Sequence, residues 1–216
     1  MRNVTLGDVA REVGLAKSSV LRYFETREEI YLQITADCWH DWSCAARAEL
    51  SHAASEPGTV ADILTQTLSE RPLFCDLLAH TQANLEHNVS THAVRTLRAG
   101  AWAAIEELAR GIMVCLPALD EAAAADLILL TSMIAGAIWQ RANPPASLAA
   151  SYQHDPNVRG TFLEFDPSMQ NVLQTLIEGT VSAERERILT YVPPADSRRR
   201  PESTHSTLPR AVDVNL

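Results

Sequence analysis

The stretch DVAREVGLAKSSVLRYF, from Asp8 to Phe24, decides the fold of the N-terminal part of the chain. It supplies what a helix-turn-helix requires within a short length. Ala10 is small enough for two helices to touch, Gly14 tolerates a positive φ in the turn, and Val20 can dock the second helix on the first. Further apolar contacts are expected from Val9, Val13 and Phe24. The same spacing also fits an ordinary helical corner inside a core, so spacing alone leaves two readings open.

The second helix of this pair, expected from about Lys17 to Phe24, has a polar and basic face. Side chains of these types reach base edges and phosphates when the N-terminus of a helix enters the major groove of DNA. A corner inside a core would bury this face, so its polarity favours DNA binding. Residues 1–24 hold four basic and two acidic side chains, in a chain whose net charge is −9. The candidate contacts on this helix are Lys17, Ser18, Ser19, Arg22 and Tyr23.

The whole 216-residue chain has the composition of packed helices. Apolar residues make up 46% and aromatic residues 6%, which suits helices better than strands. The net negative charge excludes a protein whose whole surface is basic and binds nucleic acid, but it allows a small basic binding face. The four cysteines form no CxxC pair and the N-terminus does not resemble a signal peptide, so we expect a cytoplasmic protein.

Helix start and stop signals follow one another along the chain, without a strand pattern or a repeat. Thr5 can cap a first helix that ends near Val13, and the capping box from Thr26 to Glu29 predicts a long helix from Arg27. Later helices are expected after a cap at Thr59, from Pro72, from Ser90 to Leu116, after a cap at Asp120, and from Asp166-Pro167 to about Thr190. The fold is therefore predicted to be all-α.

Three parts are predicted along the chain. A small helix-turn-helix DNA-binding head spans residues 1–40, and a larger helical bundle for ligand binding and dimerisation spans residues 41–192. The polar, Pro/Ser/Arg-rich residues 193–216 lack a periodic pattern and are expected to be a disordered tail.

The residues from Val4 to Ile34 resemble the N-terminal domain of TetR-family transcriptional regulators. The order that matches is Thr5, Asp8-Val9-Ala10, Gly14, Lys17-Ser18-Ser19, Arg22-Tyr23-Phe24 and Arg27-Glu28-Glu29. The run from Arg71 to Leu78 is similar, less specifically, to ligand-binding domains of that family. The resemblance implies a ligand-responsive dimeric regulator, usually a repressor, that binds double-stranded operator DNA.

The resemblance also implies roles for individual residues. Lys17, Ser18 and Ser19 would approach bases or phosphates, and Arg22 would be a groove contact. Tyr23 and Arg27 would contact phosphate, and Phe24 would lie in the core. Thr5, at the capped start of the motif, completes the predicted DNA-binding set.

The chain departs from the family pattern in three places. Ala16 stands where a capping Ser or Thr is usual, and Leu21 stands where a phosphate-binding Tyr is frequent. The loss of a cap costs about 1 kcal/mol. Only Met1-Arg2-Asn3 precedes Val4, where the family has a further helix that packs across the motif. We expect the true start to lie upstream of Met1; alternatively, the helix has been lost and DNA binding is poor.

Two helices of the body are candidates for the dimer face, those over residues 120–142 and 167–190. The longest apolar run, Leu127 to Trp139, is too short to cross a bilayer, so we expect a buried helix and no membrane partner. It is apolar almost all round, and Ala135-Gly136-Ala137 would let a partner helix come close. A central core helix without a dimer role is the alternative.

An effector pocket is predicted inside the body for an unidentified small molecule. His80, Asn84 and His87 fall on one helical face and can supply the polar groups that orient a ligand. A polar outer face explains the same spacing, and aromatic residues at helical spacing are more often core. The large, adaptable side chains that would line the pocket are Trp102, Met113, Met133 and Trp139.

Metal and enzyme chemistry find little support in the sequence. His40 and Cys44 share a helix face, but two ligands do not close a metal site. Trp39 and Trp42 nearby are expected to pack where head meets body. The chain lacks GxSxG, HExxH, P-loop and GxGxxG motifs, so neither an enzyme nor a cofactor is predicted. The alternative to a repressor is a helical interaction or sensor protein that keeps the TetR-like fold without DNA binding.

Overall fold

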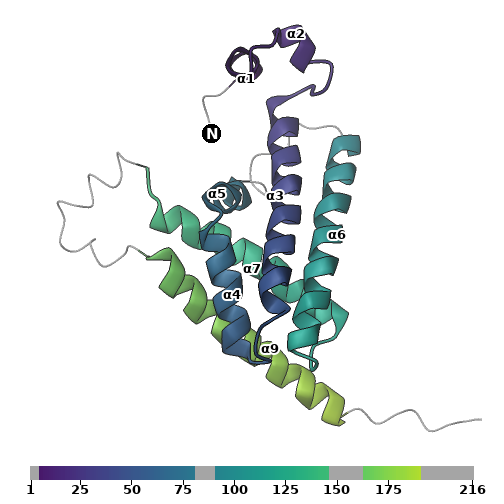
Figure 1. Ribbon diagram of the computed structural model, residues 1–216, viewed down its shortest axis with the longest axis vertical. Helices are drawn as coiled ribbons and strands as arrows, with labels where there is room; N and C mark the ends of the chain where they lie inside the picture. Colours follow the sequence, from purple (N-terminus) through teal and green to yellow (C-terminus); the bar gives the residue numbers. More distant parts are fainter. Residues whose placement is uncertain (1–4, 81–90, 146–162, 191–216) are drawn as a thin grey trace, which may run out of the picture.

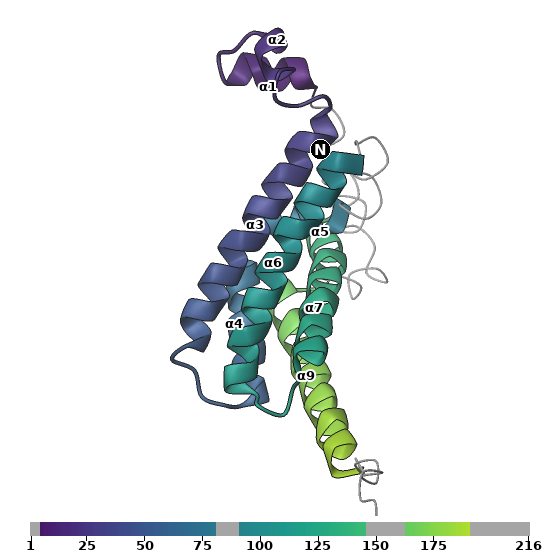
Figure 2. The same cartoon turned by 90° about the vertical axis from the view of Figure 1, so that its right-hand side faces the viewer.

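The computed structural model describes residues 5–80, 91–145 and 163–190, and within these ranges every regular element is a helix. Two short helices form a head at one end of a long helix, and the other helices form a bundle that includes the rest of that long helix (Figures 1 and 2). The all-α prediction is confirmed. The elements are α1 (Leu6–Glu12), α2 (Lys17–Val20), α3 (Arg27–Leu50), α4 (Pro57–Ser69), α5 (Pro72–His80), α6 (Thr91–Cys115), α7 (Glu121–Ala142) and α9 (Phe165–Thr190).

Three helices begin where a side chain caps free backbone N–H groups, as predicted: α1 at Thr5, α3 at Thr26 and α7 at Asp120. The Thr5 hydroxyl accepts from the backbone N–H of Asp8, whose carboxylate accepts from the Thr5 N–H at 2.9 Å. Thr26 accepts from the N–H of Glu29 at 3.2 Å. The Glu29 carboxylate reaches back to the N–H of Glu25, one residue earlier than a capping box requires. These local bonds satisfy donors that have no partner inside the helix.

Two helix starts differ from the prediction. α4 begins at Pro57, with Glu56 at the N-cap and no side-chain cap, instead of after Thr59. Proline is preorganised for the first helical position, so the chain turns helical before Thr59 can act as a cap. α9 begins at Phe165, which places Pro167 inside the first turn, where its missing N–H costs no hydrogen bond.

The core of the body lies where α3 packs along α6, α5 along α7, and α4 along α9. Trp39 and Trp42 of α3 and Phe74 of α5 form an aromatic cluster, with ring centroids 5.3 to 5.8 Å apart. The two tryptophans are buried in this core, where they pack against Phe74 of α5. Tryptophan is large enough to contact two helices, and its large apolar surface is buried favourably against α5.

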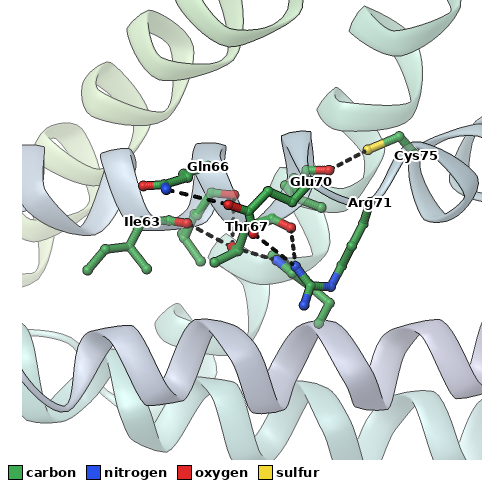
Figure 3. Close-up of polar contacts among 9 residues, drawn as sticks. Ile63, Gln66, Thr67, Glu70, Arg71 and Cys75 are labelled. Atoms are coloured by element: carbon green, nitrogen blue, oxygen red, sulfur yellow. Dashed lines mark hydrogen bonds and ion pairs between the residues drawn. The ribbon is translucent and has the colours of Figure 1, made fainter.

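The corner between α4 and α5 is held by side-chain bonds to helix carbonyls (Figure 3). The Arg71 guanidinium donates to the carbonyl of Thr67 at 2.7 Å, and the Cys75 thiol donates to the carbonyl of Leu68 at 3.4 Å. Trp42 donates its indole N–H to the Thr67 hydroxyl at 3.0 Å, which joins α3 to the same corner. These bonds fix the direction in which α5 leaves α4.

Gly136 brings α7 close to α5 of the same chain. A Cβ at this position would lie 2.8 Å from the backbone N of Ala79 and 3.0 Å from its Cα. The small residues at 135–137 were expected to admit a partner subunit; at Gly136 the helix they admit is α5. α7 is long and apolar enough by composition to cross a membrane, yet half of its most apolar window is buried inside the protein. Packing on α5, α6 and α9 therefore accounts for its apolar character.

Candidate nucleic-acid interface and effector cavity

α1 and α2 cross at the two residues that the sequence placed there. Ala10 and Val20 are 2% and 6% exposed. Gly14 adopts φ +70° in the turn, a left-handed conformation that favours glycine, and the N–H of Leu15 donates to the carbonyl of Ala10 at 2.8 Å. The head therefore contains two short helices joined by a glycine turn, with Ala10 and Val20 buried.

α2 is shorter than predicted, because it ends at Val20 and not near Phe24. Ala16 offers no side-chain cap at its start, and a single uncapped turn has little to hold it together. Arg22 and Tyr23 consequently lie in the turn that follows, where their N–H groups donate to the carbonyls of Ser19 and Val20.

Four of the candidate DNA contacts are exposed on this end of the head. Lys17, Ser18, Arg22 and Tyr23 face solvent, whereas Ser19 is half-buried. α1 and α2 pack mainly on each other, and α3 alone leads from them into the body (Figure 2). The polar and basic face is thus presented at the tip of the molecule.

The two remaining candidates are already engaged. Thr5 uses its hydroxyl in the cap of α1 and also donates to the Asp8 carboxylate at 2.7 Å, so the pKa of Asp8 is lowered mainly by Thr5. Arg27 is half-buried, and its guanidinium binds the Glu28 carboxylate at 2.7 Å. Although burial raises the pKa of Glu28, the bond from Arg27 and its charge hold it below the ordinary value. A phosphate would have to compete with Glu28 for Arg27.

Apolar side chains of the head are also exposed. Val13 is 59% exposed, and Leu15 and Leu21 are exposed as well. Leu21 stands where the family often has tyrosine, and it faces solvent at the end of α2. Val9 and Phe24 are half-buried, so the small core of the head rests on Ala10 and Val20.

A cavity of about 440 Å³ lies between α3, α5, α6 and α7. Its size falls in the range of sites for small molecules. Two predicted pocket residues, Trp102 of α6 and Met133 of α7, line it. The other lining residues are Thr35, Trp39, Leu78, Arg98, Ala101, Ile105, Leu129 and Ser132.

Three other predicted pocket residues point elsewhere. His80 bonds the carbonyl of Asp76 through Nδ1 at 2.8 Å, because both lie one turn apart on α5. Met113 packs against the main core. Trp139 packs edge-to-face on Phe165 of α9, with centroids 5.3 Å apart. Asn84 and His87 lie outside the described residues.

The sequence did not indicate the contribution of α3 to this cavity. Thr35 and Trp39 are one turn apart on α3, and they meet α6 and α7 only through the tertiary fold. Arg98 was not predicted, because the pocket was expected to consist of large apolar side chains with histidine and asparagine as its polar groups. Arg98 lies one helical turn before Trp102 on α6, and this spacing is the signal in the sequence that places the two side chains on one face.

A second hollow, of about 590 Å³, lies between α3 and α6. Its two cations share one acid: Arg47 binds Glu107 at 2.6 Å, and Arg110 binds the same carboxylate at 2.6 Å. The hydrogen bond and charge of Arg110, followed by the charge of Arg47, hold the pKa of Glu107 below its ordinary value. Since each arginine is paired with Glu107, this hollow is the weaker candidate for a ligand site.

The cysteines and histidines form no metal-binding cluster in the described part of the chain. Cys44 Sγ lies 3.7 Å from His40 Nε2, and no group of three or more His, Cys, Asp or Glu side chains is placed to hold a metal ion among residues 5–80, 91–145 and 163–190. Burial raises the pKa of the Cys75 thiol to about 12, so that thiol stays protonated at neutral pH.

Comparison with known proteins identifies the body. Residues 36–184 match the family model described as the Tetracyclin repressor-like, C-terminal domain. No curated protein matches the chain. The fold of this family generally goes with dimerisation, with DNA binding and with small-molecule effectors, and it points to a regulator without catalytic activity. The matched region covers more than half of the chain and agrees with the all-α bundle described above, so the chain belongs to the TetR family of regulators.

Proposed function

We propose that this protein is a ligand-responsive dimeric repressor of transcription that acts in the cytoplasm. The observation that carries the proposal is the exposed face of Lys17, Ser18, Arg22 and Tyr23 at the tip of a helix-turn-helix head. That head continues through α3 into a body of the tetracyclin repressor-like type. Exposed basic and hydroxyl side chains at the start of a helix suit contacts with bases and phosphates in the major groove.

We propose that the boundary between the two domains lies within the long helix α3. Residues 1–40 would serve as the DNA-binding part and residues 41–192 as the part that binds effector and partner subunit. α3 is continuous from Arg27 to Leu50 and passes through this boundary. A continuous helix transmits displacement, so a shift of α3 within the body moves the head.

The proposed mechanism uses the cavity beside α3. Thr35 and Trp39 are the residues of α3 that line it, about three to four turns before the end of the helix at Leu50. An effector that binds one arrangement of α3, α6 and α7 better than another shifts the balance between them by its differential affinity. In a dimer, the two heads must sit about one turn of DNA apart, and a few ångströms of displacement puts them out of register.

A binding measurement tests the DNA-binding part of the proposal. Duplex sites are first selected from a random pool with the wild-type protein, and affinity is then measured by band shift at several salt concentrations. Lys17→Ala and Arg22→Ala should each weaken binding roughly tenfold or more and flatten the salt dependence by about one counterion. The reason is the loss of one cation from the face presented to DNA.

Arg110→Ala is the matched control, because it removes the same charge from an exposed position of α6, outside the head and outside α7 and α9. It should leave DNA affinity within about twofold, given the screening of distant exposed charges. Equal effects of Arg110→Ala and Arg22→Ala would reduce the interaction to non-specific charge and contradict a defined DNA-binding face.

The second candidate is a TetR-like interaction or sensor protein without DNA binding. The uncapped single turn of α2 and the pairing of Arg27 with Glu28 favour it. In this case, no duplex sequence would be enriched from the random pool, while small molecules would still bind the body.

A further inference from the structure

We infer that a hollow between α4 and α9 is a second ligand site, which binds an aliphatic polyamine through carboxylates on both helices. The hollow has a volume of about 410 Å³ and lies between other helices than the effector cavity beside α3. The inference goes beyond the proposed function, because it requires neither DNA binding nor an effector.

Three carboxylates line this hollow. Asp62 lies on α4, Glu70 follows the last residue of α4, and Asp166 lies in the first turn of α9. All three residues are exposed, so a dissolved ligand can reach them. A negative wall on a chain whose net charge is −9 attracts cations.

Neutral amides lie against two of these carboxylates. Gln170 of α9 donates to the Asp62 carboxylate at 2.5 Å, and Gln66 Nε2 lies 3.5 Å from Glu70 Oε1 (Figure 3). An amide orients a carboxylate without cancelling its charge. Arg71 also approaches Glu70, with 3.9 Å between nitrogen and oxygen, and an ion pair of this kind at the surface contributes little. An incoming ammonium group therefore meets carboxylates that are oriented and still charged.

A buried hydroxyl on the wall is an independent sign of a ligand. Thr65 lines the hollow and is 5% exposed, and within the described part of the chain its Oγ1 has no hydrogen-bond partner. Thr67, two residues later on α4, instead donates to the carbonyl of Ile63 at 2.7 Å. Buried polar groups are almost always hydrogen-bonded, so a donor from outside the chain would complete Thr65.

The spacing of the acidic groups favours an extended organic cation over a metal ion. Within the described ranges, no group of three or more His, Cys, Asp or Glu side chains is placed to hold a metal ion. Asp62, Glu70 and Asp166 therefore do not converge on one point, where a metal ion would require several oxygen ligands. A polyamine carries ammonium groups at separate points of a flexible chain, and each can donate several hydrogen bonds. Such a ligand can contact α4 and α9 together.

Matched probes test the inference on the full chain by titration calorimetry without DNA. Spermidine, putrescine, butylamine and butane-1,4-diol form a series of decreasing positive charge, and Mg²⁺ is the metal probe. The titrations are made at about 0.15 M salt, which screens diffuse attraction. Putrescine should bind roughly tenfold tighter than butylamine, since a further hydrogen bond between charged groups is worth about a factor of ten or more. Spermidine should bind at least as tightly as putrescine, and the diol and Mg²⁺ should bind more weakly.

Three variants locate the site. Asp62→Asn and Asp166→Asn should each weaken putrescine binding roughly tenfold, because a neutral oxygen replaces a charged one. Thr65→Val removes the buried hydroxyl and should weaken binding by about threefold or more. Asp37→Asn is the matched control, since Asp37 is exposed on α3 and also accepts from a glutamine amide, that of Gln33, at 3.0 Å. It should leave the affinity within about twofold.

Several results would overturn the inference. It fails if putrescine does not bind saturably, if butylamine or Mg²⁺ binds as tightly, or if folded Asp62→Asn and Asp166→Asn keep the wild-type affinity. Equal weakening by Asp37→Asn would likewise reduce the binding to diffuse attraction. Should Asp62→Asn not fold, Asp166→Asn and the same control decide. A chain that binds putrescine but no duplex sequence would contradict the repressor and leave this site intact, and the reverse also holds.

Discussion

Gly136 is the residue at which one missing methyl group sets the distance between two helices. A Cβ there would meet backbone atoms of Ala79 at 2.8 and 3.0 Å, and it would lie 3.0 Å from the carbonyl carbon of Leu78. Backbone cannot rotate away as a flexible side chain can. Gly136→Ala should therefore destabilise the protein by about 1–3 kcal/mol through overpacking, measured as the free energy of unfolding in urea.

Gly100→Ala is the matched control for this prediction. Gly100 lies within α6, where an added Cβ meets nothing within 4 Å, and alanine is favoured over glycine inside a helix by about 0.5–1 kcal/mol. Gly136→Ala should consequently lower the free energy of unfolding, whereas Gly100→Ala should raise it. If Gly136→Ala also stabilised the protein, α5 and α7 would have to be farther apart than described here.

At the scale of a helix, the start of α7 is fixed by Asp120. Its carboxylate accepts the backbone N–H of Ala123 at 2.8 Å and also binds Arg187 of α9. Asp120→Ala removes both interactions and should cost roughly 0.5–2 kcal/mol, as other N-cap losses do. Asp120→Asn keeps an oxygen for the cap and should cost less. Asp41→Ala, at an exposed position of α3, should stay within about 0.5 kcal/mol of the wild type.

The pH dependence of stability gives the same prediction a second readout. The bond from the Ala123 N–H, followed by the bond from Arg187, lowers the pKa of Asp120 below its ordinary value of 3.8. The folded state therefore gains from this carboxylate above pH 3.8 and loses the gain as pH falls through the lower folded pKa. Asp120→Ala and Asp120→Asn should both flatten the acid limb of a plot of unfolding free energy against pH. An unchanged acid limb would show that Asp120 does not contribute.

Helix starts were predictable from the sequence where one local signal acted alone. Thr5, Thr26 and Asp120 cap their helices as expected, because an N-cap needs only residues within the first turn. At the start of α4, Pro57 and Thr59 offered two competing signals, and the proline, which comes first, prevailed. A local pattern does not rank such alternatives.

The cavity was predictable only in part, since its wall is assembled from distant segments. Trp102 and Met133 were identified by type, but Thr35 and Trp39 join them only because α3 packs along α6. Trp139 has the same chemical character, yet it faces Phe165 on the opposite helix. Which side of a buried helix faces a cavity depends on its neighbours, and periodicity within one helix does not specify them.

At the scale of the whole molecule, the outward surface of α7 and α9 is the proposed contact with a second subunit. α7 leaves Leu130 exposed by 43%, and α9 leaves Val172 exposed by 37%. These side chains are on the two helices that the sequence favoured for dimerisation, and exposed apolar residues gathered on adjoining helices mark interaction surfaces. A dimer across this surface would hold two heads in fixed relation, as a repressor requires.

Leu130→Lys and Val172→Lys test this surface by placing a charge where an apolar contact is proposed. Each should shift the protein from dimer to monomer in light scattering at micromolar concentration, because an unpaired charge is costly to bury. DNA affinity should then fall by roughly a hundredfold with the heads unaltered, since the second head no longer binds from the same molecule. Val114→Lys, at a 76% exposed position of α6, should remain dimeric and keep its DNA affinity. A wild type that is monomeric, or a dimer that survives both α7 and α9 substitutions, would place the pairing surface elsewhere and remove the basis for two heads in register.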